Sequence, residues 1–290
     1  MKHTCIALGF ALMFPLAAIA QGGKLDTATI DKTIGKTGQM TGDVYKISFP
    51  RSDLHVTVNG VDVRPGLALG SWSAFRSTGT DAVAHGDLVL AESEVNPVIS
   101  ALQQGGFEIT ALHNHLINAS QPILYLHFWG RGDAAKLSQT VKAALGRTKT
   151  PIANAPAPAT TAPGFDADQF QQAVGLKGTV SNGVLAMSQA RPEQIQMMGV
   201  TLPPAMGMAT SINVQSAGSG QVAATGDFVM VADEVNKVAR ALREHDIAIA
   251  ALHNHMLHGT PELYFMHFWA QGAPDKVAAG LKAALSELKK

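Results

Sequence analysis

Apolar residues change their spacing several times along the chain, and these changes predict both helices and strands. Val95, Val98, Ile99 and Leu102 recur at the spacing of one helix face, before a pair of glycines. The next run, residues 107–114, alternates with a period of two, as a half-buried strand does. We therefore expect a helix followed directly by a strand.

Other parts of the first half fit the same description. Short apolar runs broken by proline and glycine predict strands, and longer amphipathic runs predict helices. The helices are expected at 25–34 and 133–145, and the strands at 43–49, 54–58, 67–75, 87–91 and 123–129. The final order of strand, helix, strand, strand and helix favours an α+β domain with an antiparallel sheet.

The chain contains this unit twice. Residues 86–130 and 226–270 align without a gap and are identical at 18 of 45 positions, which indicates an internal duplication. A segment rich in Pro, Ala and Thr separates the copies, and such a composition is typical of a linker. We expect a first repeat domain at 21–145, a linker at 146–164 and a second, homologous domain at 165–290.

The first twenty residues resemble a secretory signal peptide. Lys2 precedes an apolar run that ends in a small-x-small pattern at Ala20. Cleavage near Ala20 would make the protein periplasmic or secreted, and would remove Cys5, the one cysteine of the chain. Disulfides and cysteine-based metal sites are therefore not expected in the mature protein.

Charge narrows the range of partners. The chain has 22 basic and 22 acidic residues, without a long run of either sign. This balance argues against nucleic acid as a partner. After the signal peptide no apolar stretch reaches the length of about 20 residues that a transmembrane helix needs. A small molecule or a cell-envelope component is the remaining expectation, and the sequence does not give the oligomeric state.

Histidines in a repeated pattern are the strongest chemical signal. His-Asn-His ends the strand that follows the helix, and a further His-Phe-Trp lies on the next strand. Two histidines at i and i+2 on a strand point to the same side, and three imidazoles with one open position form a known zinc site. The expected metal ligands are His113, His115 and His127 in the first repeat, and His253, His255 and His267 in the second.

The register of the two strands limits how these ligands can meet. A simple hairpin places His127 opposite Thr110 or Ala111, about two residues, or roughly 7 Å, from the position opposite His113. Strict alternation places Phe107 and Ile109 on the same face as the histidines. We expect one cluster of three histidines within each repeat, with zinc as the first candidate ion. Copper is the alternative, because eight of the eleven methionines lie at or after Met187.

Each of these residues also has a structural interpretation. A histidine on an apolar face is often a hydrogen-bonded core residue, and the Phe-Trp pairs are expected in a core or a pocket wall. Glu94 and Glu234 could act as general bases, ligand partners or helix-terminal charges. Asp87 follows Gly86, and we interpret this pair as a turn before a strand.

The runs Gly86–Leu90, Glu94–Pro97, Ala111–His115 and His127–Phe128 resemble the DUF1259 family, also called the LppY/LpqO family. The resemblance covers nearly all of the mature chain as two tandem copies. It implies an exported bacterial protein, sometimes a lipoprotein, without an established activity. The cysteine that a lipoprotein anchor would need is missing from the expected position.

Three functions remain open from the sequence. The first is an exported metal-binding protein with a histidine site in each repeat. The second is a metal-dependent hydrolase that uses a metal-bound water with Glu94 or Glu234 as base. The third is a non-catalytic module that binds a cell-envelope ligand through its histidines and tryptophans.

Overall fold

A computed structural model describes residues 24–153 and 161–289. The predicted signal peptide and the middle of the predicted linker, residues 154–160, lie outside these described residues. The remaining linker residues, 146–153 and 161–164, contain neither helix nor strand.

The first repeat forms a six-stranded antiparallel sheet in the order β1-β2-β5-β6-β8-β7. Two of its helices begin after an aspartate cap, as at Asp26, whose carboxylate accepts a hydrogen bond from the Thr29 backbone N–H. The elements in chain order are α1 (Thr27–Ile34), β1 (Gln39–Thr41), β2 (Val44–Pro50), β3 (Thr57–Val58), β4 (Val61–Asp62), β5 (Gly70–Ser77), β6 (Ala82–Ala91), the 3-10 helix η1 (Glu92–Glu94), α2 (Val95–Gln104), β7 (Glu108–Asn114), β8 (Ile123–Gly132) and α3 (Ala134–Leu145).

The second repeat forms the same arrangement, with the sheet order β15-β17-β14-β13-β10-β9. Its elements are α4 (Ala167–Val174), β9 (Gly178–Ser181), β10 (Val184–Ala190), β11 (Gln196–Met197), β12 (Val200–Thr201), η2 (Pro204–Met206), β13 (Ala209–Gly218), β14 (Gln221–Met230), α5 (Ala232–Glu244), β15 (Ala248–His253), β16 (Gly259–Thr260), β17 (Tyr264–Gly272) and α6 (Pro274–Ser286). The predicted α+β fold and its duplication are confirmed.

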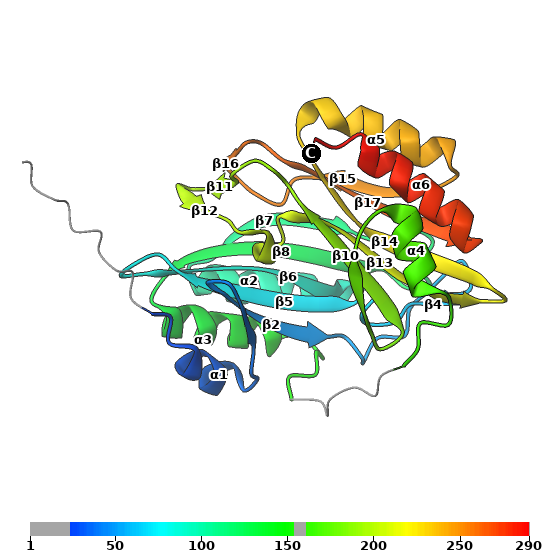
Figure 1. Cartoon of the computed structure of the whole chain (residues 1–290). Helices are drawn as coiled ribbons and strands as arrows, with labels where there is room; N and C mark the ends of the chain where they lie inside the picture. Colours follow the sequence, from blue (N-terminus) through cyan, green and yellow to red (C-terminus); the bar gives the residue numbers. More distant parts are fainter. Residues whose placement is uncertain (1–23, 154–160, 290) are drawn as a thin grey trace, which may run out of the picture.

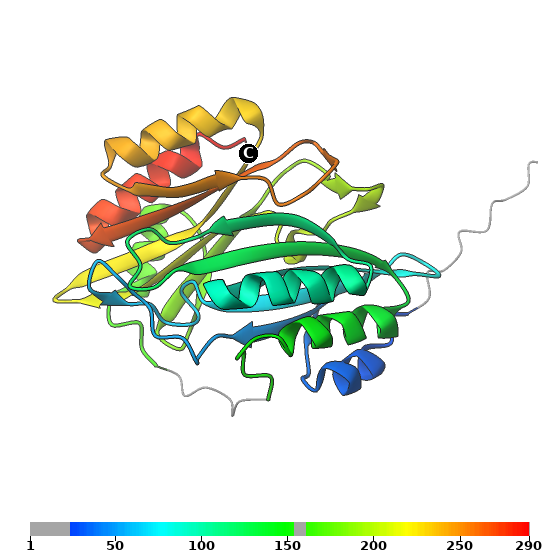
Figure 2. The same ribbon diagram turned by 180° about the vertical axis from the view of Figure 1, so that it is seen from behind.

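The two repeats pack sheet against sheet, with their helices on the outside. Figures 1 and 2 show α1, α2 and α3 on one outer face, α4, α5 and α6 on the other, and the two sheets between them. Each set of helices buries one apolar core against its own sheet, for example around Phe128 in the first repeat and Phe268 in the second. None of the helices in the described ranges has the length and apolar character needed to cross a membrane.

Two further apolar clusters join the repeats across the sheet interface. One contains Trp129 of the first repeat with Met197 and Phe265 of the second. The other contains Tyr125 of the first repeat with Trp269 of the second. Strand alternation explains this division, because Tyr125 and Trp129 point toward the partner repeat while Phe128 points toward the helices. The predicted core role of the two Phe-Trp pairs is confirmed.

Some predicted element bounds are wrong, and one error concerns a site residue. Gly86 and Asp87 do not form a turn: both lie within β6, where Asp87 pairs with His127 on β8. The glycine is required by close packing. A Cβ atom added to Gly86 would lie 2.4 Å from the Phe128 ring and 2.5 Å from the Trp72 carbonyl oxygen. At the equivalent Gly226, it would lie 1.9 Å from the Ser211 carbonyl oxygen.

We expect Gly86→Ala to lower the free energy of unfolding by about 1–3 kcal/mol, the usual cost of overpacking a core. The Trp72 carbonyl is backbone and cannot rotate away, so the sheet itself must shift. Urea denaturation followed by circular dichroism measures the effect. Gly70→Ala is the matched control on β5, since its added Cβ would meet nothing closer than 3.8 Å. Equal urea midpoints for the two variants would contradict this account of Gly86.

Candidate metal centre

A β-bulge turns the histidines toward the second repeat. On β7, the pairing with β8 shifts between Ile109, opposite Phe128, and Ala111, opposite His127. Phe107 and Ile109 therefore pack with the helix-side core, whereas Ala111 and His113 face the other sheet. The expectation that all of these residues share one face is wrong. The second repeat has the same shift, between Ile249 and Ala251.

The predicted register of His127 is confirmed, because it pairs with Ala111 and not with His113. The two imidazoles still meet, with the His127 Nε2 atom 3.0 Å from the His113 Nε2 atom. Two nitrogens bound at 2.0–2.1 Å to one tetrahedral zinc would lie about 3.3 Å apart. The offset of two residues along the strand is therefore bridged by the side chains themselves.

The six histidines form one cluster between the repeats. His113 stacks on His253 with ring centroids 3.6 Å apart, His115 lies 3.5 Å from His267, and His127 lies 3.8 Å from His255. The first pair joins equivalent residues of the two repeats. The second and third pairs correspond to each other, because His115 is equivalent to His255 and His127 is equivalent to His267. The contacts thus follow a pseudo-twofold relation between the repeats. The expected separation into one cluster per repeat is wrong, because face-to-face packing of the sheets brings both triads to the same place.

Potential ligand atoms fall into two groups, and each group draws on both repeats. The first consists of His113, His127, His253 and His255, and the second of His115, Asp227 and His267; within each, one ligand atom per residue lies within 4.8 Å of the others. All of these residues are buried or half-buried. The chain therefore has histidine clusters that could bind metal ions, and both would be shared between the repeats.

Many nitrogen atoms of this cluster have no hydrogen-bond partner among the described residues. The atoms are His115 Nδ1, His127 Nδ1, His267 Nε2, and both ring nitrogens of His253 and of His255. A buried polar atom without a partner costs about 1–3 kcal/mol, so a group of them calls for a ligand. Imidazole nitrogens are suitable ligands for zinc and copper, and the donor set fits a bound cation.

The sequence interpretation missed the role of two carboxylates. Asp87 and Asp227 occupy equivalent positions on β6 and β14, directly across from His127 and His267. The Asp227 Oδ1 atom lies 2.6 Å from His267 Nδ1, and the Asp87 Oδ2 atom lies 4.0 Å from His127 Nε2. The presence of an aspartate at the same position in both repeats could have indicated a place in the site. The glycine that precedes each aspartate favoured the interpretation as a turn.

Glu94 and Glu234 lie elsewhere, in two equivalent ion-pair networks. Arg51 donates to both oxygens of Glu94, and these also accept the backbone N–H groups of Ala91 and Lys149. Glu234 makes the corresponding bonds with Arg191, Val231 and Lys289. Neither glutamate belongs to a potential ligand group. The general-base role stays a prediction, and the contacts give both residues a structural role at the start of a helix.

Burial keeps the imidazoles neutral. Desolvation lowers the pKa values of His113, His115, His127, His255 and His267 below 6.5, and lowers that of His253 to about 2. Neighbouring imidazoles lower most of these values further. Burial raises the pKa values of Asp87 and Asp227, and for Asp87 the nearby Asp227 acts in the same direction. Neutral imidazoles are the form that binds metal, so the site is prepared for ligation below neutral pH.

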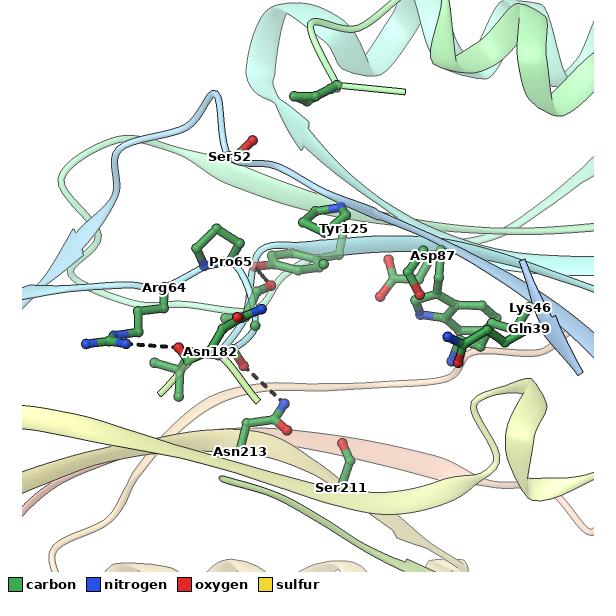
Figure 3. A pocket seen from close by; sticks show the side chains of 18 of the residues that line it. Gln39, Lys46, Ser52, Arg64, Pro65, Asp87, Tyr125, Asn182, Ser211 and Asn213 are labelled. Carbon is green, nitrogen blue, oxygen red and sulfur yellow. Dashed lines mark hydrogen bonds between the residues drawn. The ribbon is translucent and has the colours of Figure 1, made fainter. Parts of the chain in front are cut away.

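A cavity of about 1100 Å³ lies beside the cluster and is lined by His115, Asp87 and Asp227. Figure 3 shows Asp87, Lys46 and Tyr125 along its first-repeat side, with Ser211 and Asn213 opposite them on the second repeat. The Lys46 ammonium lies 4.0 Å from the centre of the Trp72 ring. Burial lowers the pKa of Lys46 to about 8, although Asp87 acts in the opposite direction. Sequence interpretation missed this cavity, which only the contact between the repeats creates.

We expect the metal-free protein to lose stability as the pH falls below about 6.5. Unfolded histidines bind protons near that pH while the folded ones stay neutral, so the unfolded state takes up more protons and is favoured by acid. The raised pKa values of Asp87 and Asp227 stabilise the folded state in acid, but these are two groups and the histidines with lowered pKa values are six. Thermal unfolding in EDTA, at about pH 7.5 and about pH 5.5, measures the effect. A melting temperature that does not fall at the lower pH would contradict the neutral cluster.

Comparison with known proteins gives a family and no function. A family model described as Domain of Unknown Function (DUF1259) matches residues 28–147 and 168–287. No curated protein matches the chain. Solved structures are only distantly similar. EtuB from Clostridium kluyveri is 14% identical over 87% of this chain and 89% of that chain, with a TM-score of 0.20.

The trimeric bacterial microcompartment shell protein PduB is 11% identical over 86% of this chain and 88% of that chain, with a TM-score of 0.21. Crystal form I of TP0453 is 11% identical over 87% of this chain and 96% of that chain, with a TM-score of 0.20. At these values the likenesses carry no argument about fold or function. The two matched regions span most of the chain and coincide with its two repeats, and the chain therefore belongs to the DUF1259 family.

Proposed function

We propose that this is an exported metal-binding protein that holds its ions between the two repeats. The observation that carries the proposal is the convergence of His113, His127, His253 and His255, whose ligand atoms lie within 4.8 Å of one another. Two of the four residues come from each repeat, so a bound ion would also join the two sheets. Export rests on the apolar leader of the sequence alone.

Zinc fits the first group best. Four neutral imidazoles match a closed tetrahedral site, which is the usual geometry of structural zinc. Copper is less well supported. Met197, Met206 and Met208 pack in the apolar cluster between the repeats, where their side chains serve as core residues. The ligand chemistry is therefore that of imidazole and carboxylate and not of thioether.

The second group has a different character. His115, Asp227 and His267 supply only three ligand atoms, and two of these residues line the cavity. Three protein ligands with an open position describe catalytic metal sites more often than structural ones. A metal-dependent hydrolase is therefore the second candidate, with Asp87 better placed than Glu94 to accept a proton. Hydrolytic turnover by the metal-loaded protein would separate this candidate from simple metal binding.

Removing one ligand from either repeat is expected to weaken the same binding event. We expect His113→Ala and His253→Ala each to lower the affinity for Zn²⁺ by at least roughly tenfold, since the loss of a hydrogen-bonding partner behind a ligand already costs 10- to 100-fold. Calorimetric titration of metal-stripped full-length protein measures affinity and stoichiometry together, with elemental analysis as a second readout.

His55→Ala is the matched control, because His55 is exposed and belongs to neither ligand group. A shared site predicts that the double variant His113→Ala/His253→Ala loses no more zinc than either single variant, because both residues belong to one ligand group. If the repeats held separate sites, each single variant would remove one equivalent of bound zinc and the double variant would remove both. That result would reject the shared site. Failure of the wild-type protein to take up any divalent ion would reject the proposal as a whole.

We also expect chelation to reduce thermal stability. A ligand present at 100 times its dissociation constant stabilises the native state by about 2.7 kcal/mol, and for a chain of this size this corresponds to roughly 5–10 °C in melting temperature. Differential scanning calorimetry with Zn²⁺ and with EDTA, at one pH, measures the difference. A melting temperature unaffected by EDTA would favour the remaining alternative, a cell-envelope module that binds its ligand without metal.

A further inference from the structure

The two repeats carry different side chains at equivalent positions on the strands beside the cavity. Strand register identifies the equivalent positions: Trp72 pairs with Asp87 as Ser211 pairs with Asp227, and Lys46 lies opposite Ala74 as Ala186 lies opposite Asn213. The large Lys46 and Trp72 of the first repeat thus correspond to the small Ala186 and Ser211 of the second.

Two more substitutions follow the same trend. His85 corresponds to Thr225: the His85 Nδ1–H donates to the Phe128 carbonyl as the Thr225 hydroxyl donates to the Phe268 carbonyl. Tyr125 corresponds to Phe265, which lacks the hydroxyl group. Because the unit is duplicated, each position in one repeat can be compared with its equivalent in the other. Lys46, Trp72 and Tyr125 line the cavity from the first repeat, and the equivalent residues of the second repeat lack their ammonium, indole and hydroxyl groups. The pseudo-twofold relation of the histidines therefore does not extend to the cavity.

The cavity has the chemistry of a ligand site. Lys46 forms no ion pair with a carboxylate in the described part of the chain, and its ammonium is held against Trp72. A cation placed in this way at a cavity wall lacks a hydrogen-bonded anion. The volume of about 1100 Å³ lies slightly above the usual range for small-molecule sites and exceeds the size of a simple inorganic anion.

Neutral polar groups line much of the remaining wall. Ser48 and Gln39 on the first repeat and Ser211 and Asn213 on the second supply hydroxyl and amide groups. The Asn213 amide nitrogen donates to the Leu67 carbonyl, which fixes the side chain and leaves its oxygen as an acceptor. Such walls match a ligand that carries several hydroxyl groups.

We propose that the cavity binds a sugar acid, whose carboxylate pairs with Lys46 and whose hydroxyl groups bond to the serine and amide side chains. This inference rests on the proposed metal site for one contact only. A further oxygen of the ligand would reach the ion held by His115, Asp227 and His267, two of which line the same cavity. The Lys46 contact is independent of that ion.

Calorimetric titration of the full-length protein with digalacturonate tests the proposal, with its methyl ester and inorganic phosphate as comparison probes. We expect zinc-loaded wild type to bind digalacturonate and to bind the methyl ester roughly ten- to a hundredfold more weakly, since a hydrogen bond to a charged group contributes about 1.5–3 kcal/mol. Lys46→Met should cause a similar loss, and Lys46→Arg should recover most of it. Lys177→Met is the matched control, because Lys177 is exposed and does not line the cavity.

Each other outcome overturns a defined part of the inference. Equal affinity for acid and ester, or an unaffected Lys46→Met variant, would reject the anionic anchor. Inorganic phosphate bound as tightly as digalacturonate would reject the sugar, and no binding of any probe would reject the site. Repeating the titration in EDTA separates the two proposals. If the affinity for digalacturonate is the same in EDTA and still depends on Lys46, the metal contact is rejected and the pairing of Lys46 with the carboxylate stands. If the protein takes up no zinc, the proposed metal site alone is rejected.

Discussion

The arrangement of this protein depends on the burial of six imidazoles between two sheets. A buried histidine is tolerated when it is neutral and when its nitrogens have partners. Here the first condition is met by desolvation, which lowers the pKa values of the whole cluster. The second is not met by the described residues, since several ring nitrogens remain without hydrogen bonds. A cation bound by one nitrogen from each of His113, His127, His253 and His255 would give several of these residues a partner and would also join the two repeats.

Apolar packing beside the histidines offsets the free-energy cost of burying them. Apolar clusters lie on the interface with the histidines, one around Met206 and Trp129 and another around Tyr125 and Trp269. Buried apolar area provides the main attraction between such sheets. Polar bonds then fix the register of the repeats: the Gln215 side chain accepts from the Arg64 backbone N–H and donates to the Asp62 carbonyl. The cluster is thus held at a defined position between two sheets that could not slide without breaking these bonds.

The duplicated repeats form a histidine cluster that follows the pseudo-twofold relation and, beside it, a cavity that does not. The histidines keep the same pattern in both repeats because each one contacts a histidine of the other repeat. Positions farther from the centre lack this constraint, and there Lys46 and Trp72 stand against Ala186 and Ser211. Large side chains on one sheet and small ones on the other leave a cavity on one side of the cluster. The symmetric part suits ion binding, and the asymmetric part suits recognition of an asymmetric organic molecule.

The sequence by itself determined the α+β architecture, the duplication and the six histidines of the cluster. Alternation on strands and the repeated His-Asn-His motif are local properties. The short connection between the two strands predicted that His127 pairs with Thr110 or Ala111, and it pairs with Ala111. Local pattern could not reveal the bulge before Ala111, because one extra residue reverses the faces of Phe107 and Ile109 without changing the composition of the strand. It also could not show that the two triads interleave, that Asp227 joins one ligand group, or that Asp87 lies beside His127. Those facts depend on the packing of one sheet against another, which brings together residues 140 positions apart, as it does His113 and His253.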